Sequence, residues 1–228
     1  MELGSDRVAG RSVHSGPACL DFAALSATIR PGGDMWMSKV VYLTGAPASG
    51  KSSTTRLLLE RVPDLMVWEY GARLTAHVIA RSAGVATQDD LRARSATVVT
   101  PRDVDEVDDT LIAFVAEHRA SYPVIIDSHP VTKEAYGYRI TPFSLERFEQ
   151  LAPDEVWVLY ASPEETRRRI GADDGGRPMV TEEEARTHTA LQASVAATYG
   201  MSLGRPVYLF DTAAPRAELV DRLVERLS

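Results

Sequence analysis

Residues 39–61 read KVVYLTGAPASGKSSTTRLLLER and contain the one motif in the chain that is specific by itself. Its segment 45–52, GAPASGKS, fits the pattern G-x-x-x-x-G-K-[ST], a loop that cradles phosphate groups. The apolar residues 39–44 predict a short buried strand before the loop, and residues 52–61 predict a helix after it. This is the context that the motif requires, so the sequence predicts an anion-binding nest at a helix N-terminus.

The motif gives a role to each polar residue of the loop. Lys51 is expected to reach the outer phosphates of a nucleotide, and the Ser52 hydroxyl is expected to bind Mg²⁺. The chain has 22 arginines but only three lysines, yet a lysine stands at position 51. A compact ammonium can follow a phosphate through transfer in a way that a planar guanidinium cannot. The predicted nucleotide-binding residues are Gly45, Ala48, Ser49, Gly50, Lys51, Ser52 and Ser53.

Composition and charge restrict the class of protein. The 228 residues suffice for one α/β domain with a small insert. A net charge of −7 disfavours a nucleic-acid surface, and the single cysteine, Cys19, fits a reducing compartment. Because no apolar run reaches 18 residues, we expect no membrane span and a cytoplasmic protein. Residues 1–34, which lack a sustained hydrophobic period, are interpreted as a flexible extension before a P-loop domain at 35–228.

Strand and helix patterns alternate along the rest of the chain. Five strands are predicted, at 39–44, 65–69, 124–127, 156–160 and 207–210. Helices are predicted at 52–61, 71–83, 87–99, 100–120, 144–151, 162–171, 181–200 and 215–227, with loops at 128–142 and 172–180. Short apolar strands separated by helices predict an α/β fold, in which a five-stranded parallel sheet is covered by helices on both faces.

Asp127 ends a predicted apolar strand, as the Walker B acid of a P-loop protein does. At the carboxyl end of the strand it would face the phosphate loop and, with Ser52, hold the magnesium ion. His129 follows two residues later, and either a role at the acceptor site or a bond to the loop backbone would explain it.

Arginines are the other candidates for contact with phosphate. Arg92 and Arg94 lie on the predicted helix 87–99, where a solvated helix face explains them better, taken alone, than a fork for an acceptor phosphate. Residues 167–169 are all arginines near a helix C-terminus, and successive helical residues point about 100° apart, so only one or two can face a shared site. Arg177 lies in the loop 172–180 and either closes over a transferring phosphate or solubilises the loop.

The order of these features resembles the adenylate kinase group of nucleoside monophosphate kinases, and most of all its archaeal-type branch. The residues that carry the resemblance are 40–52, Tyr70-Gly71, Asp90-Leu91-Arg92, Ile126-Asp127-Ser128-His129, Lys133, Gly137-Tyr138, Arg168-Arg169 and Ala197-Thr198-Tyr199-Gly200. The resemblance implies a helical acceptor-binding region at about 70–100 and a short lid at about 172–180. It also implies that Arg92 grips the acceptor phosphate, and that Arg168 or Arg169, with Arg177, neutralises the transferring group.

The chain departs from the family pattern in its arginines. The lid segment contains only Arg177, and the helix after it contains only Arg186, close to its start. Arg139 follows Tyr138 where the archaeal-type pattern continues with an apolar residue. These departures concern the identity of the phosphate acceptor, including whether it is a nucleotide, and not the binding of ATP.

Three hypotheses about function follow. The first is an ATP- and Mg²⁺-dependent kinase that transfers the γ-phosphoryl group to a small acceptor, most simply a nucleoside monophosphate. The second is a kinase of a phosphate-free metabolite or antibiotic hydroxyl, with Asp127 accepting the hydroxyl proton. The third is a nucleotide-binding regulatory module; a GTPase is disfavoured because residues 132–135, TKEA, lack the aspartate of a base-reading N/T-K-x-D motif.

Overall fold

The computed structural model describes residues 38–81, 84–173 and 178–227. The extension predicted at residues 1–34 lies outside these ranges.

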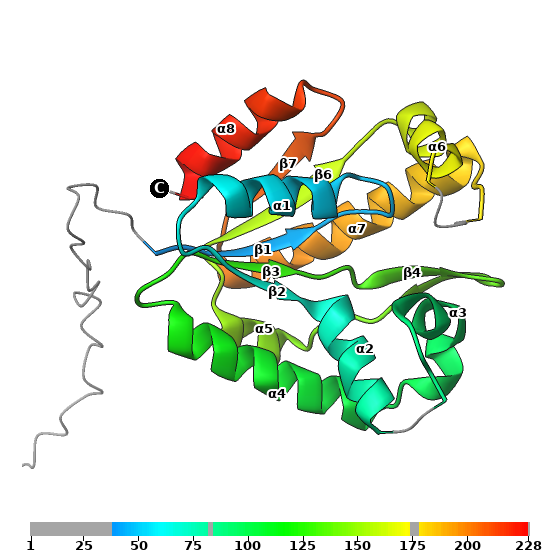
Figure 1. The fold of residues 1–228 in the computed structure, drawn as a ribbon, viewed down its shortest axis with the longest axis horizontal. Coiled ribbons are helices and arrows are strands. Elements are labelled where there is room, and N and C mark those ends of the chain that lie inside the picture. The colour runs from blue at the N-terminus through cyan, green and yellow to red at the C-terminus, as the bar shows by residue number, and fades with distance from the viewer. Residues whose placement is uncertain (1–37, 82–83, 174–177, 228) are drawn as a thin grey trace, which may run out of the picture.

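A five-stranded parallel sheet forms the centre of the molecule, with the strand order β2-β3-β1-β6-β7 (Figure 1). Its strands are β1 (Val40–Thr44), β2 (Met66–Glu69), β3 (Val124–Asp127), β6 (Glu155–Tyr160) and β7 (Val207–Asp211). Each neighbouring pair is parallel, which confirms the predicted sheet. Because β1 lies between β3 and β6, the chain crosses from one side of β1 to the other, and the loop after β1 lies at this switch point, where open α/β sheets bind ligands.

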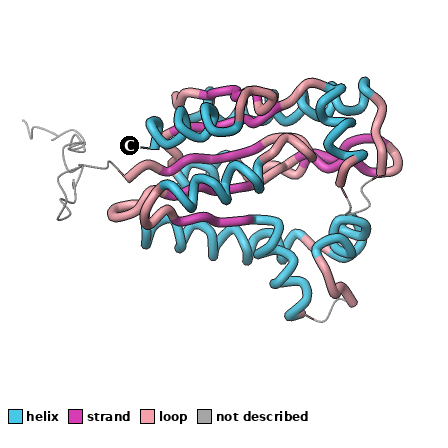
Figure 2. The backbone as a smooth tube through the Cα atoms, turned by 45° about the horizontal axis from the view of Figure 1, so that its top comes forward, coloured by secondary structure: helices cyan, strands magenta, loops and turns pink. Residues whose placement is uncertain are grey.

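Helices cover both faces of the sheet and complete three layers (Figure 2). On one face, α1 (Lys51–Arg61) and α8 (Arg216–Leu227) share a core with Val41 and Leu43 of β1. On the other face, α4 (Pro101–His118), α5 (Leu145–Leu151) and α7 (Glu182–Leu203) share a core with Val40 and Tyr42. Successive strand residues point to opposite faces, so one apolar strand supplies both cores.

The remaining helices lie near the carboxyl ends of the strands. They are α2 (Tyr70–Ala80), α3 (Gln88–Val98) and α6 (Pro163–Gly171). Figure 1 shows α2 and α3 on the α4 side of the sheet, and α6 beside the N-terminal end of α7. The carboxyl ends of the strands, next to the phosphate loop, therefore lie between α2 and α3 on one side and α6 on the other.

The prediction of a loop at residues 128–142 is wrong for much of its length. This segment contains an antiparallel hairpin of β4 (Val131–Glu134) and β5 (Gly137–Ile140), with Val131 opposite Ile140. Each strand is only four residues long and is mostly polar, so neither has the apolar run that marks the core strands. The hairpin is held instead by tertiary packing of β4 against α7.

The predicted helix starts are confirmed by their capping hydrogen bonds. Thr87, Thr100 and Thr181 each form a full capping box. Ser162 accepts a hydrogen bond from the Glu165 N–H, which is one half of the box predicted there.

Two predicted helix ends are wrong. The helix predicted at 71–83 ends as α2 at Ala80, with Arg81 as its C-cap. The long helix does not stop at Gly200 but continues as α7 to Leu203 and ends at Gly204, which has a φ of 62°. Gly200 serves close packing rather than termination, because a Cβ there would lie 2.2 Å from Val207 Cγ2. Gly204 takes the left-handed conformation in which helices commonly end.

Candidate active site

The phosphate-loop motif lies between the end of β1 and the start of α1, as predicted. The Ser49 N–H donates to the Ala46 carbonyl at 3.1 Å, and Ala48 has a φ of 59°, so the chain turns sharply before the helix. Only glycine fits at position 45, because a Cβ there would lie 2.3 Å from the backbone oxygen of Leu159. The Lys51 ammonium donates to the Gly45 carbonyl at 2.9 Å and thereby spans the loop.

Two hydroxyls of the loop lie in different surroundings. Ser49 is 2% exposed, and its Oγ has no hydrogen-bond partner in the described part of the chain. Ser52 is exposed and lies in the first turn of α1. The helix is preceded by Gly50, which offers no side-chain cap to the first N–H groups of α1. These donors, together with the Lys51 ammonium, suit an anionic ligand.

Asp127 lies beside the strand that leads into the loop. It is the register partner of Leu43 in β1, and the next residue, Ser128, donates its N–H to the Leu43 carbonyl at 3.0 Å. Burial raises the pKa of Asp127 above its ordinary value, while the nearby Lys51 ammonium lowers it and Glu69 raises it. The structure therefore brings Lys51 and Asp127 together at the same edge of the sheet.

Glu69 is a site residue that the sequence interpretation missed. It ends β2 and is the register partner of Asp127 in the β2–β3 pairing. The strand order, which no local pattern encodes, places these two carboxylates side by side.

The residues present fit a magnesium nucleotide. Mg²⁺ is usually held by one or two carboxylates or hydroxyls together with substrate phosphates, and it keeps several waters. Ser52 and Asp127 would provide such a sparse set, and the Ser49 hydroxyl and the Lys51 ammonium would serve as donors to phosphate. When bound, the metal would neutralise charge on the terminal phosphates of the nucleotide.

The neighbouring arginines of α6 have different surroundings. Arg169 donates to the Ala48 carbonyl at 3.1 Å, to Thr212 Oγ1 at 2.8 Å and to the Thr212 carbonyl at 2.8 Å. The Arg168 side chain is 68% exposed and pairs with Glu165 at 2.6 Å. Arg169 therefore joins the phosphate loop to the segment after β7, whereas Arg168, the alternative that the resemblance offered, faces solvent.

A cavity opens next to Asp127, on the α2–α3 side of the sheet. Its walls come from α2, α3, α4, the end of β3 and the β4–β5 hairpin. The lining residues are Tyr70, Gly71, Leu74, Thr75, Gln88, Leu91, Ser95, Val99, Val104, Asp108, Ser128, His129, Pro130, Thr132, Arg139, Thr141, Pro142 and Phe143. The lining combines apolar side chains, such as Leu74, Leu91 and Phe143, with hydrogen-bonding ones, so a small molecule in the cavity could contact both kinds.

Arg139 is the described arginine that lines this cavity. Its guanidinium donates to Ser95 Oγ at 2.7 Å and lies 3.1 Å from Glu134 Oε1. The sequence had marked Arg139 only as a departure from a family pattern; the hairpin, which was not predicted, carries it to the cavity. His129, whose role was left open, also lines the cavity.

The other predicted arginines are placed less fully. Arg92 lies in α3, but its side chain is outside what the structure describes, and Arg177 lies outside the described residues. Arg94 is exposed and donates to the Gly84 carbonyl at 2.9 Å.

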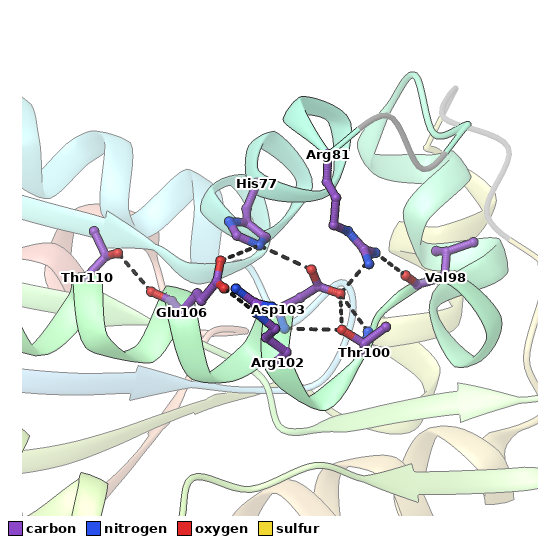
Figure 3. A network of polar contacts seen from close by, with 8 residues as sticks. All are labelled: His77, Arg81, Val98, Thr100, Arg102, Asp103, Glu106 and Thr110. Carbon is purple, nitrogen blue, oxygen red and sulfur yellow. Dashed lines mark hydrogen bonds and ion pairs between the residues drawn. The ribbon is translucent and has the colours of Figure 1, made fainter.

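A polar network fixes the helices that form the cavity walls (Figure 3). Asp103 of α4 accepts from the Thr100 hydroxyl at 2.6 Å and pairs with Arg81, just after α2, at 3.0 Å. Arg81 also donates to the Val98 carbonyl at the end of α3. His77 of α2 contacts Asp103 at 3.2 Å. One buried carboxylate thus holds three helices together.

A glycine-rich loop, a helix and an acid at the carboxyl edge of a parallel sheet define a P-loop nucleotide-binding protein with the three-layer fold of P-loop kinases. The chain belongs to the AAA domain family, whose model matches residues 44–186, more than half of its length. Among the described residues, we find no helix that could span a bilayer.

Individual proteins similar to this chain include archaeal adenylate kinases. The adenylate kinase of Pyrococcus abyssi is 27% identical over 195 residues, covering 84% of this chain and 96% of its own. The adenylate kinase of Thermococcus onnurineus is 26% identical over 195 residues, with the same coverage. A solved unliganded structure described as a sugar kinase from Janibacter sp. HTCC2649 matches with a TM-score of 0.48 and 15% identity, covering 82% of this chain and 93% of that one.

Proposed function

We propose that this protein transfers the γ-phosphoryl group of ATP, bound with Mg²⁺, to a nucleoside monophosphate. The observation that carries the proposal is the position of the cavity. Its wall includes Ser128 and His129, the two residues that follow Asp127, and Asp127 lies beside the strand that leads into the phosphate loop. An acceptor in the cavity would therefore have its reactive end next to the terminal phosphate of a nucleotide on the loop.

The donor side would be built from the residues of the loop. Lys51 and the backbone N–H groups hold the outer phosphates, while Ser52 and Asp127 hold the metal ion. In the transfer, an oxygen of the acceptor phosphate attacks the γ-phosphorus, and the bond to the β-phosphate oxygen breaks, so that ADP leaves with that electron pair. Positioning and charge neutralisation supply most of the catalysis in such reactions.

The acceptor side would use arginines. Arg139 lines the cavity, and Arg92 is four residues after Gln88 and three before Ser95, which both line it. We propose that Arg92, which the similarity to adenylate kinases suggests, and Arg139 hold the acceptor phosphate. Arg177, with the segment 172–180, would close over the reacting groups, as the similarity to adenylate kinases suggests.

A second candidate is a kinase whose acceptor is a hydroxyl. A monophosphate acceptor is already ionised, but a hydroxyl must lose a proton as it attacks. The pKa of Asp127 is raised by burial, which suits it to accept that proton. In this case Arg92 would contribute nothing to the acceptor.

Release of ADP by the full chain separates these candidates. The panel is AMP, GMP, CMP, UMP, dTMP and simple hydroxyl metabolites, each with Mg²⁺ and ATP. We expect one or more monophosphates to accelerate ADP release, and Lys51→Ala to abolish the acceleration. Stimulation only by a phosphate-free alcohol would support the second candidate. Tight ATP binding without any stimulation would favour a regulatory module and overturn both kinase proposals.

Arginine variants test the acceptor assignment. Arg92→Ala should raise the KM for the monophosphate. Arg94→Ala is the matched control, because Arg94 lies on the same helix and its side chain donates to the carbonyl of Gly84, which precedes that helix. Equal kinetics for these two variants would contradict a role for Arg92. Arg139→Ala should raise the same KM while leaving ATP affinity unchanged.

A further inference from the structure

Asp108 is the one acidic side chain among the described residues that line the acceptor cavity, and the proposed function gives it no role. It lies on α4 and is 3% exposed. A carboxylate removed from water is costly unless it is well paired. The hydrogen-bond partners of the Asp108 carboxylate therefore decide whether this residue has only a structural role.

The partners of Asp108 leave acceptor capacity on the carboxylate. Among the described residues, one side-chain hydrogen bond reaches it, from the Tyr70 hydroxyl to Oδ1 at 2.7 Å. Arg147 Nε lies 3.9 Å from Oδ2, beyond hydrogen-bond range. Two carboxylate oxygens can accept about four hydrogen bonds, so a ligand in the cavity can donate to Asp108.

Arg147 does not neutralise this part of the wall. It contacts Asp109 at 2.6 Å and Asp105 at 3.5 Å, so one guanidinium faces three carboxylates, including that of Asp108. The excess of negative charge favours a ligand group that donates hydrogen bonds and disfavours a carbonyl oxygen. Burial raises the pKa of Asp108 to about 6, which still leaves the carboxylate mostly ionised at neutral pH.

The other walls suit a flat ring beside this carboxylate. Leu74, Leu91, Val104 and Phe143 line the same cavity, and the Phe143 ring lies 5.4 Å from that of Tyr70 in an edge-on arrangement. Apolar walls beside a buried carboxylate suit a heterocycle that carries an amino group.

We propose that Asp108, held by Tyr70, reads the base of the acceptor and selects nucleobases that present an exocyclic amino group. This inference rests on the proposed function, because it assigns the base end of the same acceptor. Guanine fits best, since its ring N–H and amino group offer adjacent donors to the two carboxylate oxygens. Hypoxanthine, the base of IMP, lacks the amino group and keeps only the ring N–H, and uracil carries a carbonyl oxygen where cytosine carries its amino group.

Matched acceptors test the proposal with the unaltered protein. GMP and IMP differ only in the 2-amino group, and CMP and UMP differ at the 4-amino position. We expect the amino member of each pair to have a kcat/KM that is higher by roughly 10- to 100-fold, the range for one hydrogen bond to a charged group. Equal values within both pairs would overturn the inference while leaving the kinase proposal intact.

The variant Asp108→Asn then assigns the selectivity to this residue. The substitution keeps the size of the side chain but replaces one acceptor by a donor, so we expect the GMP-to-IMP ratio to fall toward one, mainly through KM. Asp109→Asn is the control, because this neighbour on α4 pairs with Arg147 and is 71% exposed. It should leave the ratio unchanged.

Two further readouts keep failures distinguishable. Affinity for Mg-ATP, measured by calorimetry, should be equal in the unaltered protein and in Asp108→Asn, which excludes misfolding as the cause of lost selectivity. Tyr70→Phe, which removes only the hydroxyl that holds Asp108, should weaken the selectivity less than Asp108→Asn does. If no monophosphate is phosphorylated at all, the proposed function fails, and this inference fails with it.

Discussion

The Lys51 ammonium donates a hydrogen bond to the Gly45 carbonyl across the phosphate-binding loop, at a distance of 2.9 Å. The two residues are the cation and the first glycine of the motif, so the bond holds the loop in a closed turn. A nucleotide phosphate in the loop would compete for the same ammonium. Lys51 is therefore both a support of the loop and its main charge.

Replacing Lys51 should remove activity but not the fold. We expect Lys51→Ala to lower kcat/KM for phosphoryl transfer by at least about 100-fold, the typical cost of one preorganised donor to developing charge. Lys51→Arg should rescue little, because a planar guanidinium does not match a compact ammonium. Lys133→Ala is the control, since this lysine pairs with Glu184 at 3.1 Å outside the loop. Initial rates measure the activity of each variant, and circular dichroism measures whether it is folded. Near-normal rates in Lys51→Ala would contradict the assignment of Lys51 to the phosphate site.

Arg169 and Arg168 should differ sharply although they are adjacent. Arg169→Ala removes hydrogen bonds to Ala48 and Thr212, so we expect a higher KM for ATP and a loss of stability of about 1–3 kcal/mol. Arg168→Ala should change the free energy of unfolding little, because its pair with Glu165 is exposed and screened by solvent. Urea unfolding and ATP titration provide the measurements. Similar effects of the two variants would mean that the loop does not depend on Arg169.

Asp103 should stabilise the cavity walls in a pH-dependent way. Burial acts to raise its pKa, but hydrogen bonds from Thr100 and the ion pair with Arg81 lower it below the ordinary value of 3.8. A lowered pKa in the folded state means that the stabilisation is present above pH 3.8 and is lost as the pH falls through the lower value.

We therefore expect Asp103→Ala to lower the free energy of unfolding by about 2–4 kcal/mol at neutral pH, because it leaves Arg81 and the start of α4 without their partner. The difference from the unaltered protein should shrink in acid. Asp105→Ala, on the same helix but with a side chain that is 63% exposed, should cost much less. A pH-independent difference would argue against the ion pair.

For Asp108 we expect the opposite dependence of stability on pH. Burial raises its pKa from 3.8 to about 6; the Tyr70 hydroxyl and Arg147 oppose the shift, and Asp105 and Asp109 add to it. A raised pKa means that the contribution of this group to stability is full below pH 3.8 and is lost as the pH rises through about 6. Asp108→Asn carries no charge at any pH, so its stability relative to the unaltered protein should increase over this range, by at most about 3 kcal/mol. Urea unfolding at the two ends of the range measures the change, and a fall instead of a rise would contradict it.

The local sequence was enough to predict the phosphate loop, the parallel sheet and the starts of several helices. Residues 45–52 identify the loop because its glycine spacing and its lysine follow from short-range sterics and phosphate chemistry. The apolar runs that became β1, β3 and β6 predicted a buried parallel sheet for an equally local reason, and capping residues such as Thr100 predicted where helices begin. Asp127 was found because it ends one of these runs.

Only the tertiary structure decided which side chains share the site. Glu69 lies beside Asp127 through strand register, and Arg139 reaches the cavity on a polar hairpin without an apolar signal. Arg169, not Arg168, meets the loop because about 100° of helical rotation separates them and packing alone sets which one faces inward. Local patterns fix the backbone of each element, whereas strand order, helix rotation and the approach of distant segments depend on contacts between residues far apart in the chain.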